Sequence, residues 1–190
     1  MKEIQELINN SYDEKEANRY KSFIPDKDAL NLTVEIGREV LTLFPDIPGA
    51  CVPMSSMWGA LIRDNSNYPV HVVAGTLSVD NTLVFGEQSN KCNYKTLFKS
   101  SNLDWDGHCW IVFGNYICDI SICRTAYSRR ASSTLKNKIV SMFGEKGGLF
   151  LNTYSNLENI GFKYKEEYVL TDEEISKMFT AATFIMDRKK

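Results

Sequence analysis

Two apolar runs joined by a two-residue turn place the strongest constraint on the fold of this chain. The runs are His108–Phe113 and Tyr116–Ile122, and the Gly114-Asn115 pair between them is a favourable hairpin turn. Both runs have the pattern of strands, and the turn makes them neighbours. We therefore expect an antiparallel sheet in the middle of the chain.

The register of this hairpin brings two polar residues together. Counting from the turn puts Trp110 opposite Asp119. His108 then lies opposite Ser121 and shares a face with Asp119, about 7–8 Å away between backbones and within side-chain reach. A carboxylate there would fix the tautomer of the imidazole and stabilise its cation. The alternative is that His108 is a hydrogen-bonded core histidine and Asp119 a surface residue near the turn.

Cys51 is the candidate partner of this histidine. Pro53 suits the first position of a helix and disfavours helical geometry at Val52, so we expect Cys51 at or just before a first helical turn. The positive end of the helix dipole would lower the thiol pKa there and favour the reactive thiolate. The alternative is a small buried apolar side chain, which is the more common role of a free cysteine.

Elsewhere the spacing of apolar residues separates helices from strands. Between Lys2 and Phe44 it fits two helices broken near Pro25, and a third helix is expected over Cys51–Arg63. The other expected elements are strands at Tyr68–Leu77, Thr82–Gly86 and Phe162–Leu170, a helix over Leu135–Phe143, and a last helix that starts with a Thr171/Glu174 capping box.

Composition and charge exclude several classes of function. The net charge is -2 and the basic residues are spread along the chain, so we expect no nucleic-acid partner. The first twenty residues are too polar for a signal peptide, and no segment is apolar for long enough to span a membrane. Five cysteines, an odd number, favour reduced thiols in the cytoplasm, although an export route without a signal peptide would leave no trace in the sequence. No C-x-x-C or H-x-x-x-H pattern occurs, so neither a metal nor another cofactor is expected.

The order of these residues resembles the bacterial transglutaminase-like superfamily of papain-like cysteine proteases. The similarity is greatest to small thiol peptidases such as the leader-peptide proteases of lasso-peptide maturation, and it covers about Cys51 to Ser121. It is carried by four pieces of the chain: Cys51-Val52-Pro53-Met54-Ser55-Ser56, the run Tyr68–Gly75, Gly107-His108-Cys109-Trp110, and Asp119.

The resemblance implies an α+β fold of the papain-like or transglutaminase-like type, with N-terminal helices and a nucleophile helix packed on an antiparallel sheet. We expect one domain over residues 1–190, divided into a helical N-terminal part (1–48), a catalytic core (49–123) and a C-terminal part (124–190).

The resemblance also implies roles for Cys51, His108, Asp119 and Trp110. Cys51 would be the nucleophile that forms a thioester, His108 the general base and then acid, and Asp119 the residue that orients the histidine. Trp110 would be a wall beside the triad. Apart from the resemblance, Trp105 is a further candidate for a core residue or a wall of the substrate cleft. The chain departs from papain-type enzymes in one respect, because no Gln precedes the nucleophile between residues 44 and 50 to help bind the oxyanion.

Three classes of function are consistent with this interpretation of the sequence. The first is a thiol hydrolase, a peptidase or amidase that acts on a peptide or protein substrate. The second is an acyltransferase that uses the same triad but passes the thioester to an amine. The third is a non-catalytic module of the same fold that binds a protein partner.

Overall fold

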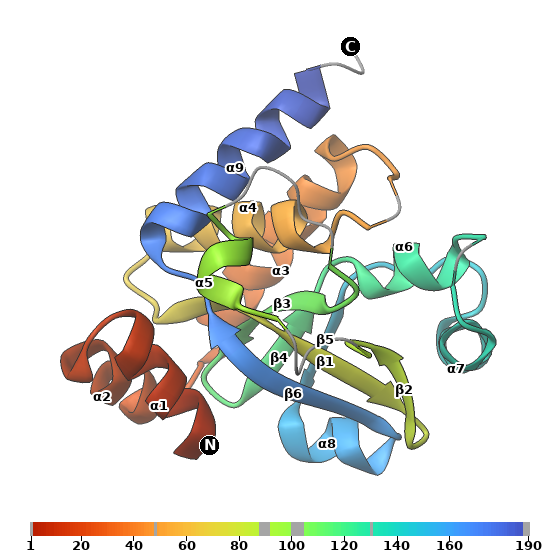
Figure 1. Ribbon diagram of the computed structural model, residues 1–190, viewed down its shortest axis with the longest axis horizontal. Helices are drawn as coiled ribbons and strands as arrows, with labels where there is room; N and C mark the ends of the chain where they lie inside the picture. The colour runs from red at the N-terminus through yellow and green to blue at the C-terminus, as the bar shows by residue number, and fades with distance from the viewer. Residues whose placement is uncertain (1, 48, 88–91, 100–104, 130, 188–190) are drawn as a thin grey trace.

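The structure is a computed structural model that describes residues 2–47, 49–87, 92–99, 105–129 and 131–187, and it has an α+β architecture (Figure 1). Its strands form one curled antiparallel sheet in the order β2-β1-β3-β4-β5, with β6 also paired to β1. The strands are β1 (Val70–Val79), β2 (Thr82–Phe85), β3 (His108–Phe113), β4 (Tyr116–Asp119), β5 (Phe150–Thr153) and β6 (Phe162–Val169).

Strand β1 organises the sheet because three strands pair with it. The residues Val73–Val79 pair with β6 along one edge of β1. The other edge is shared: Val70–Gly75 pairs with β3, and Leu77–Val79 pairs with β2. Strands β2 and β3 therefore follow each other along the same edge, which brings the end of β2 next to the start of β3 at His108.

The hairpin between β3 and β4 has the register expected from its turn. Phe113 pairs with Tyr116 and Ile111 with Cys118, and Gly114 adopts a φ of 58°, which a side chain would disfavour. The second strand is shorter than predicted, since it ends at Asp119 and a helix begins at Ile122. The physical reason is that the Asp119 carboxylate accepts the backbone N–H of Ile122 and turns the chain out of the sheet.

The N-terminal region has three helices where two were predicted. They are α1 (Lys2–Ser11), α2 (Glu14–Ser22) and α3 (Lys27–Leu43). The extra break follows from capping, because the Asp13 side chain accepts the N–H of Glu16 and starts a new helix after α1. The break near Pro25 is confirmed, with Asp26 capping α3.

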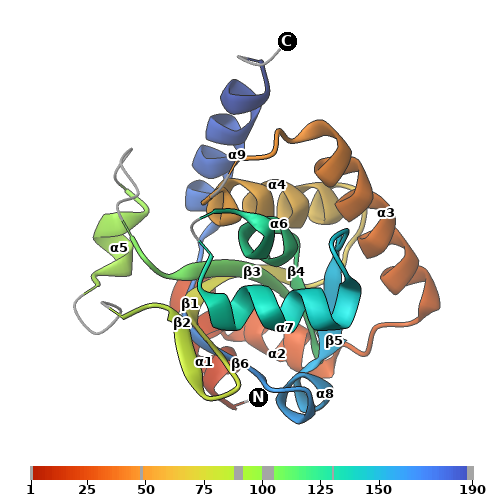
Figure 2. The same ribbon diagram turned by 90° about the vertical axis from the view of Figure 1, so that its right-hand side faces the viewer.

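Two layers of helices cover the two faces of the sheet (Figure 2). Helix α4 (Cys51–Asp64) packs on one face together with α3 and α9 (Asp172–Asp187). The opposite face carries α1, α2 and α8 (Tyr154–Asn159). Helices α6 (Ile122–Tyr127) and α7 (Ser133–Phe143) lie to one side of the sheet and pack their buried residues into the same core. Trp58 of α4 is fully buried in the first layer and Trp110 of β3 in the second. No helix in the described part of the chain is both long and apolar enough to traverse a bilayer.

The C-terminal elements were predicted in part. Helix α7, strand β6 and the Thr171/Glu174 capping box are confirmed, and the box holds Thr171 N–H 2.9 Å from the Glu174 carboxylate. The short elements α5 (Tyr94–Leu97), α6, β5 and α8 were not predicted.

Candidate active site

Cys51 is the first residue of α4. The residue before it, Ala50, gives this helix end no side-chain cap, so the first N–H groups of α4 have no acceptor from a capping side chain. Pro53 lies in the third helical position and Val52 is helical, which corrects the expectation that Pro53 would open the helix. Pro53 is tolerated there because the first four N–H groups of a helix have no intrahelical partner in any case.

The structure brings His108 and Asp119 into direct contact. The Nε2 atom of His108, the first residue of β3, lies 2.5 Å from Oδ2 of Asp119, the last residue of β4. Both side chains are buried, with exposed fractions of 1% and 0%. A charged pair removed from water to this extent interacts more strongly than it would on the surface.

Several donors hold the Asp119 carboxylate in place. Its Oδ1 accepts the backbone N–H groups of Ser121 and Ile122, each at 3.0 Å, and the Ser121 hydroxyl at 3.2 Å. Its Oδ2 accepts the Tyr164 hydroxyl at 3.0 Å from β6. Burial on its own raises the pKa of Asp119, but the His108 cation and these hydrogen bonds together hold that pKa below its usual range.

The His108 ring lies between aromatic side chains. The Phe85 ring at the end of β2 stacks on it, with centroids 4.6 Å apart and planes 12° from parallel. On the same strand, Trp110 lies 6.0 Å from the imidazole, and Tyr164 lies 6.4 Å away. These rings keep water from the contact between His108 and Asp119.

Cys51 is the third residue of the candidate site. Burial lowers the pKa of His108, but the Asp119 charge and hydrogen bond and a further hydrogen bond with Cys51 raise it to about 10. Because Asp119 occupies Nε2, Nδ1 is the ring atom available to the thiol. Cys51 keeps 9% of its surface exposed, more than either partner. At neutral pH the histidine is therefore a cation placed beside a thiol at a helix start.

Gly75 allows the backbone to approach this site. It lies opposite His108 in the sheet, at an irregularity in the pairing of β1 with β6. A Cβ atom at this position would lie 2.0 Å from the carbonyl oxygen of Lys165 and 3.0 Å from the Trp110 ring. Any side chain here would push β6, and with it Tyr164, away from the carboxylate.

The two tryptophans expected to line the cleft occupy different environments. Trp110 has no exposed surface and packs behind His108, so it supports the imidazole from the interior and offers no face to a substrate. Trp105 is only partly buried, and its ring lies 5.9 Å from the rings of both Tyr94 and Phe98. Of the two, Trp105 is the one that a bound molecule can reach.

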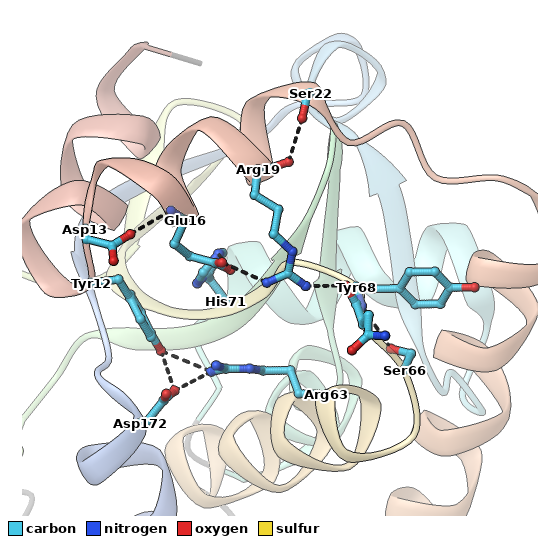
Figure 3. A network of polar contacts seen from close by, with 11 residues as sticks. Tyr12, Asp13, Glu16, Arg19, Ser22, Arg63, Ser66, Tyr68, His71 and Asp172 are labelled. Carbon is cyan, nitrogen blue, oxygen red and sulfur yellow. Dashed lines mark hydrogen bonds and ion pairs between the residues drawn. The ribbon is translucent and has the colours of Figure 1, made fainter.

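The second histidine belongs to a separate polar network beneath the N-terminal helices (Figure 3). His71 is fully buried, and its Nε2 lies 3.3 Å from Oε1 of Glu16 in α2. Burial lowers its pKa, and Glu16 offsets this only in part. The edges of Tyr12 and Tyr20 pack on its ring at 5.2 and 5.5 Å. His71 therefore helps to hold the N-terminal helices against the sheet.

The cysteines are all unpaired, and four of the five are buried: Cys51, Cys109, Cys118 and Cys123, with Cys92 half-exposed. Burial raises the pKa of Cys109, Cys118 and Cys123. Within the described ranges, no group of three or more His, Cys, Asp or Glu side chains is placed to hold a metal ion.

Comparisons with protein-family models, with curated proteins and with solved structures gave no match for this chain. The function proposed below therefore rests on the geometry of the site. Sequence reasoning missed two of its residues, Phe85 and Tyr164, because both reach the site on strands paired with β1 and not on the hairpin itself.

Proposed function

We propose that the protein is a thiol-dependent hydrolase that cleaves a peptide or amide bond through Cys51, His108 and Asp119. The observation that carries the proposal is the buried 2.5 Å contact between His108 and Asp119, with Cys51 close enough to the same imidazole to help raise its pKa. A nucleophile helix packed on an antiparallel sheet that supplies the base and the carboxylate is also the papain-like arrangement, and we include that fold in the proposal.

The first half of the reaction forms a thioester. The Cys51 thiolate attacks the carbonyl carbon of the substrate, and the carbonyl π electrons move onto oxygen. In this proposal the backbone N–H of Cys51, at the positive end of α4, binds the oxyanion together with a second donor that is not assigned. His108 then gives its proton to the amine nitrogen, the C–N bond breaks, and the amine leaves. The acyl group stays on sulfur and the imidazole is neutral.

The second half releases the acid. His108 takes a proton from water, and the resulting hydroxide attacks the thioester carbon. When the tetrahedral adduct collapses, the C–S bond breaks and Cys51 leaves as a thiolate beside the His108 cation. Asp119 stays ionised throughout, because its pKa lies below the usual range, and it keeps the imidazole oriented.

The substrate in this proposal is a peptide or protein, and no metal or other cofactor takes part. We include a cytoplasmic location in the proposal, because free thiols persist in a reducing compartment.

The test uses a mixture of peptides of diverse sequence, incubated with the wild-type protein and with Cys51→Ala and analysed by mass spectrometry. We expect cleavage products that require Cys51. A second incubation contains a primary amine at high concentration, and products that carry this amine in place of a carboxyl group would show acyl transfer instead. A Cys51 that is unreactive in both incubations and toward alkylating reagents would overturn the proposal in favour of a binding module.

A further inference from the structure

Arg124 connects the two halves of the candidate site. It lies in α6, the helix that follows Asp119, and it reaches across to the segment that precedes Cys51. Its Nη1 donates to the carbonyl oxygens of Phe44 and Pro45, each at 3.0 Å, and its Nη2 donates to that of Leu41 at 2.6 Å. These carbonyls end α3 and begin the stretch of chain that leads to α4.

The same short helix holds the carboxylate of the triad. Ser121 is the residue that precedes α6 and Ile122 is its first residue, and both donate their N–H groups to Asp119 Oδ1. The start of helix α6 therefore donates backbone hydrogen bonds to Asp119, and its Arg124 side chain donates to the carbonyls at the end of α3. A shift of α6 would change both contacts together.

The chemistry of this contact requires a guanidinium group. Its acceptors are neutral carbonyls at the C-terminal end of a helix, where the helix dipole attracts a cation. The planar fork of arginine can bond three carbonyls at once, whereas a lysine ammonium is a single point charge on a flexible stem. Nη1 also lies 3.9 Å from the Met54 sulfur of α4, so the fork contacts the nucleophile helix itself.

We propose that Arg124 is a positioning residue of the triad, which fixes the end of α3 and, through Met54, the first turn of α4 relative to α6, and through α6 relative to Asp119 and His108. This inference rests on the proposed function, because it concerns how the Cys51 thiol is held beside the imidazole. Arg124 acts on Cys51 through the backbone carbonyls it holds and through its contact with Met54 of α4.

The test measures the rate of Cys51 alkylation by iodoacetamide against pH, with peptide mapping to separate the five thiols. In Arg124→Ala we expect the rate at Cys51 near neutral pH to fall about tenfold, because a small displacement of a reacting group is costly. The pH midpoint of this labelling should rise as well, because the displaced thiol no longer meets the imidazole in the same geometry. Millimolar guanidinium should restore part of the rate in this variant, while the same concentration of sodium chloride should not.

Arg63→Ala is the matched control. Arg63 lies near the other end of α4, where it pairs with Asp172 at 2.5 Å and contacts the Tyr12 hydroxyl at 3.1 Å. Its loss should lower stability and leave the pH profile of Cys51 unchanged. Arg124→Lys keeps the charge and most of the length, and it decides the question if Arg124→Ala does not fold. Arg124→Lys should change the rate and the pH midpoint of Cys51 labelling in the same direction as Arg124→Ala, but by less.

The outcomes separate the two proposals. A folded Arg124→Ala or Arg124→Lys protein with the wild-type rate and midpoint at Cys51 would overturn the role of Arg124 and leave the proposed function intact. If Cys51 of the wild-type protein reacts no faster than Cys92, the proposed function itself fails, and the inference fails with it.

Discussion

Phe85 lies flat against the imidazole of His108, with ring centroids 4.6 Å apart and planes only 12° from parallel. This contact joins two strands that never pair with each other, because β2 and β3 follow one another along the same edge of β1. The ring covers one face of a histidine that carries a charge in the interior. A charge pair screened from water in this way keeps more of its attraction.

Phe85→Ala should open the histidine to solvent. We expect faster hydrogen exchange of the His108 ring N–H, measured by ¹⁵N NMR, and slower alkylation of Cys51, because water weakens the pairing that orients the imidazole. Leu83→Ala on the same strand is the control, since Leu83 is exposed and its loss should change neither quantity. Equal exchange rates in the wild-type and Phe85→Ala proteins would show that the ring does not shield His108.

Asp119→Asn removes the anionic partner of His108 and keeps the shape of the side chain. The carboxylate is a main cause of the raised His108 pKa, so that pKa should fall from about 10 by about one to three units. NMR titration of the two histidines can follow this, with His71 as internal control. Cys118→Ser should alter stability and leave the His108 pKa in place, because Cys118 packs on the other face of the hairpin. An unchanged His108 titration in Asp119→Asn would contradict the pairing.

Tyr164→Phe removes one of the donors to the Asp119 carboxylate. The free energy of unfolding should fall by about 1.5–3 kcal/mol, the range for a hydrogen bond to a charged group. Tyr127→Phe is the control, because the Tyr127 hydroxyl bonds uncharged backbone groups of Gly144 and Gly147. Tyr127→Phe should lower the free energy of unfolding by about 0.5–1.5 kcal/mol. Urea unfolding measures the free energy of unfolding of both variants. A loss in Tyr164→Phe that is equal to or smaller than the loss in Tyr127→Phe would argue against an ionised Asp119.

The raised His108 pKa also predicts how stability depends on pH. The folded protein binds the His108 proton more tightly than the unfolded chain, whose histidine titrates near about 6.5. The stabilisation from this proton is therefore complete below that pH and is lost as the pH rises toward the folded-state pKa, which Asp119 keeps high.

The measurement is best made in Cys51→Ala, where the thiol does not add its own titration. Its free energy of unfolding should decrease between neutral and alkaline pH. The double variant Cys51→Ala, His108→Ala should lack this decrease, and identical curves for the two proteins would contradict the assigned pKa.

The parts of the site that the sequence could predict are those determined by neighbours in the chain. The turn at Gly114-Asn115 fixes the register of β3 and β4, so the approach of His108 to Asp119 follows from counting residues. The start of α4 at Cys51 was also close to its expected place, although Pro53 lies deeper in the helix than its local preference suggests.

The parts that could not be predicted depend on pairing between distant segments. Phe85 and Tyr164 reach the imidazole and the carboxylate only because β2 and β6 both pair with β1, and nothing local to either residue specifies that pairing. Helix α6 is six residues long, too short for a periodic signal, and the side chain of Asp119 helps to start it. The break between α1 and α2 is different, because Asp13 followed by Glu16 is a capping signal that the sequence contains.

The most direct test of the thiol-imidazole pair is the rate of iodoacetamide labelling at each cysteine as a function of pH. Cys51 is expected to label faster than the other four cysteines, with a midpoint below the free-thiol value of about 8.5. Cys92 serves as the internal reference, because it is the half-exposed thiol outside the site. Uniformly slow labelling of Cys51, or a midpoint at or above that of Cys92, would contradict an activated nucleophile and favour a binding module.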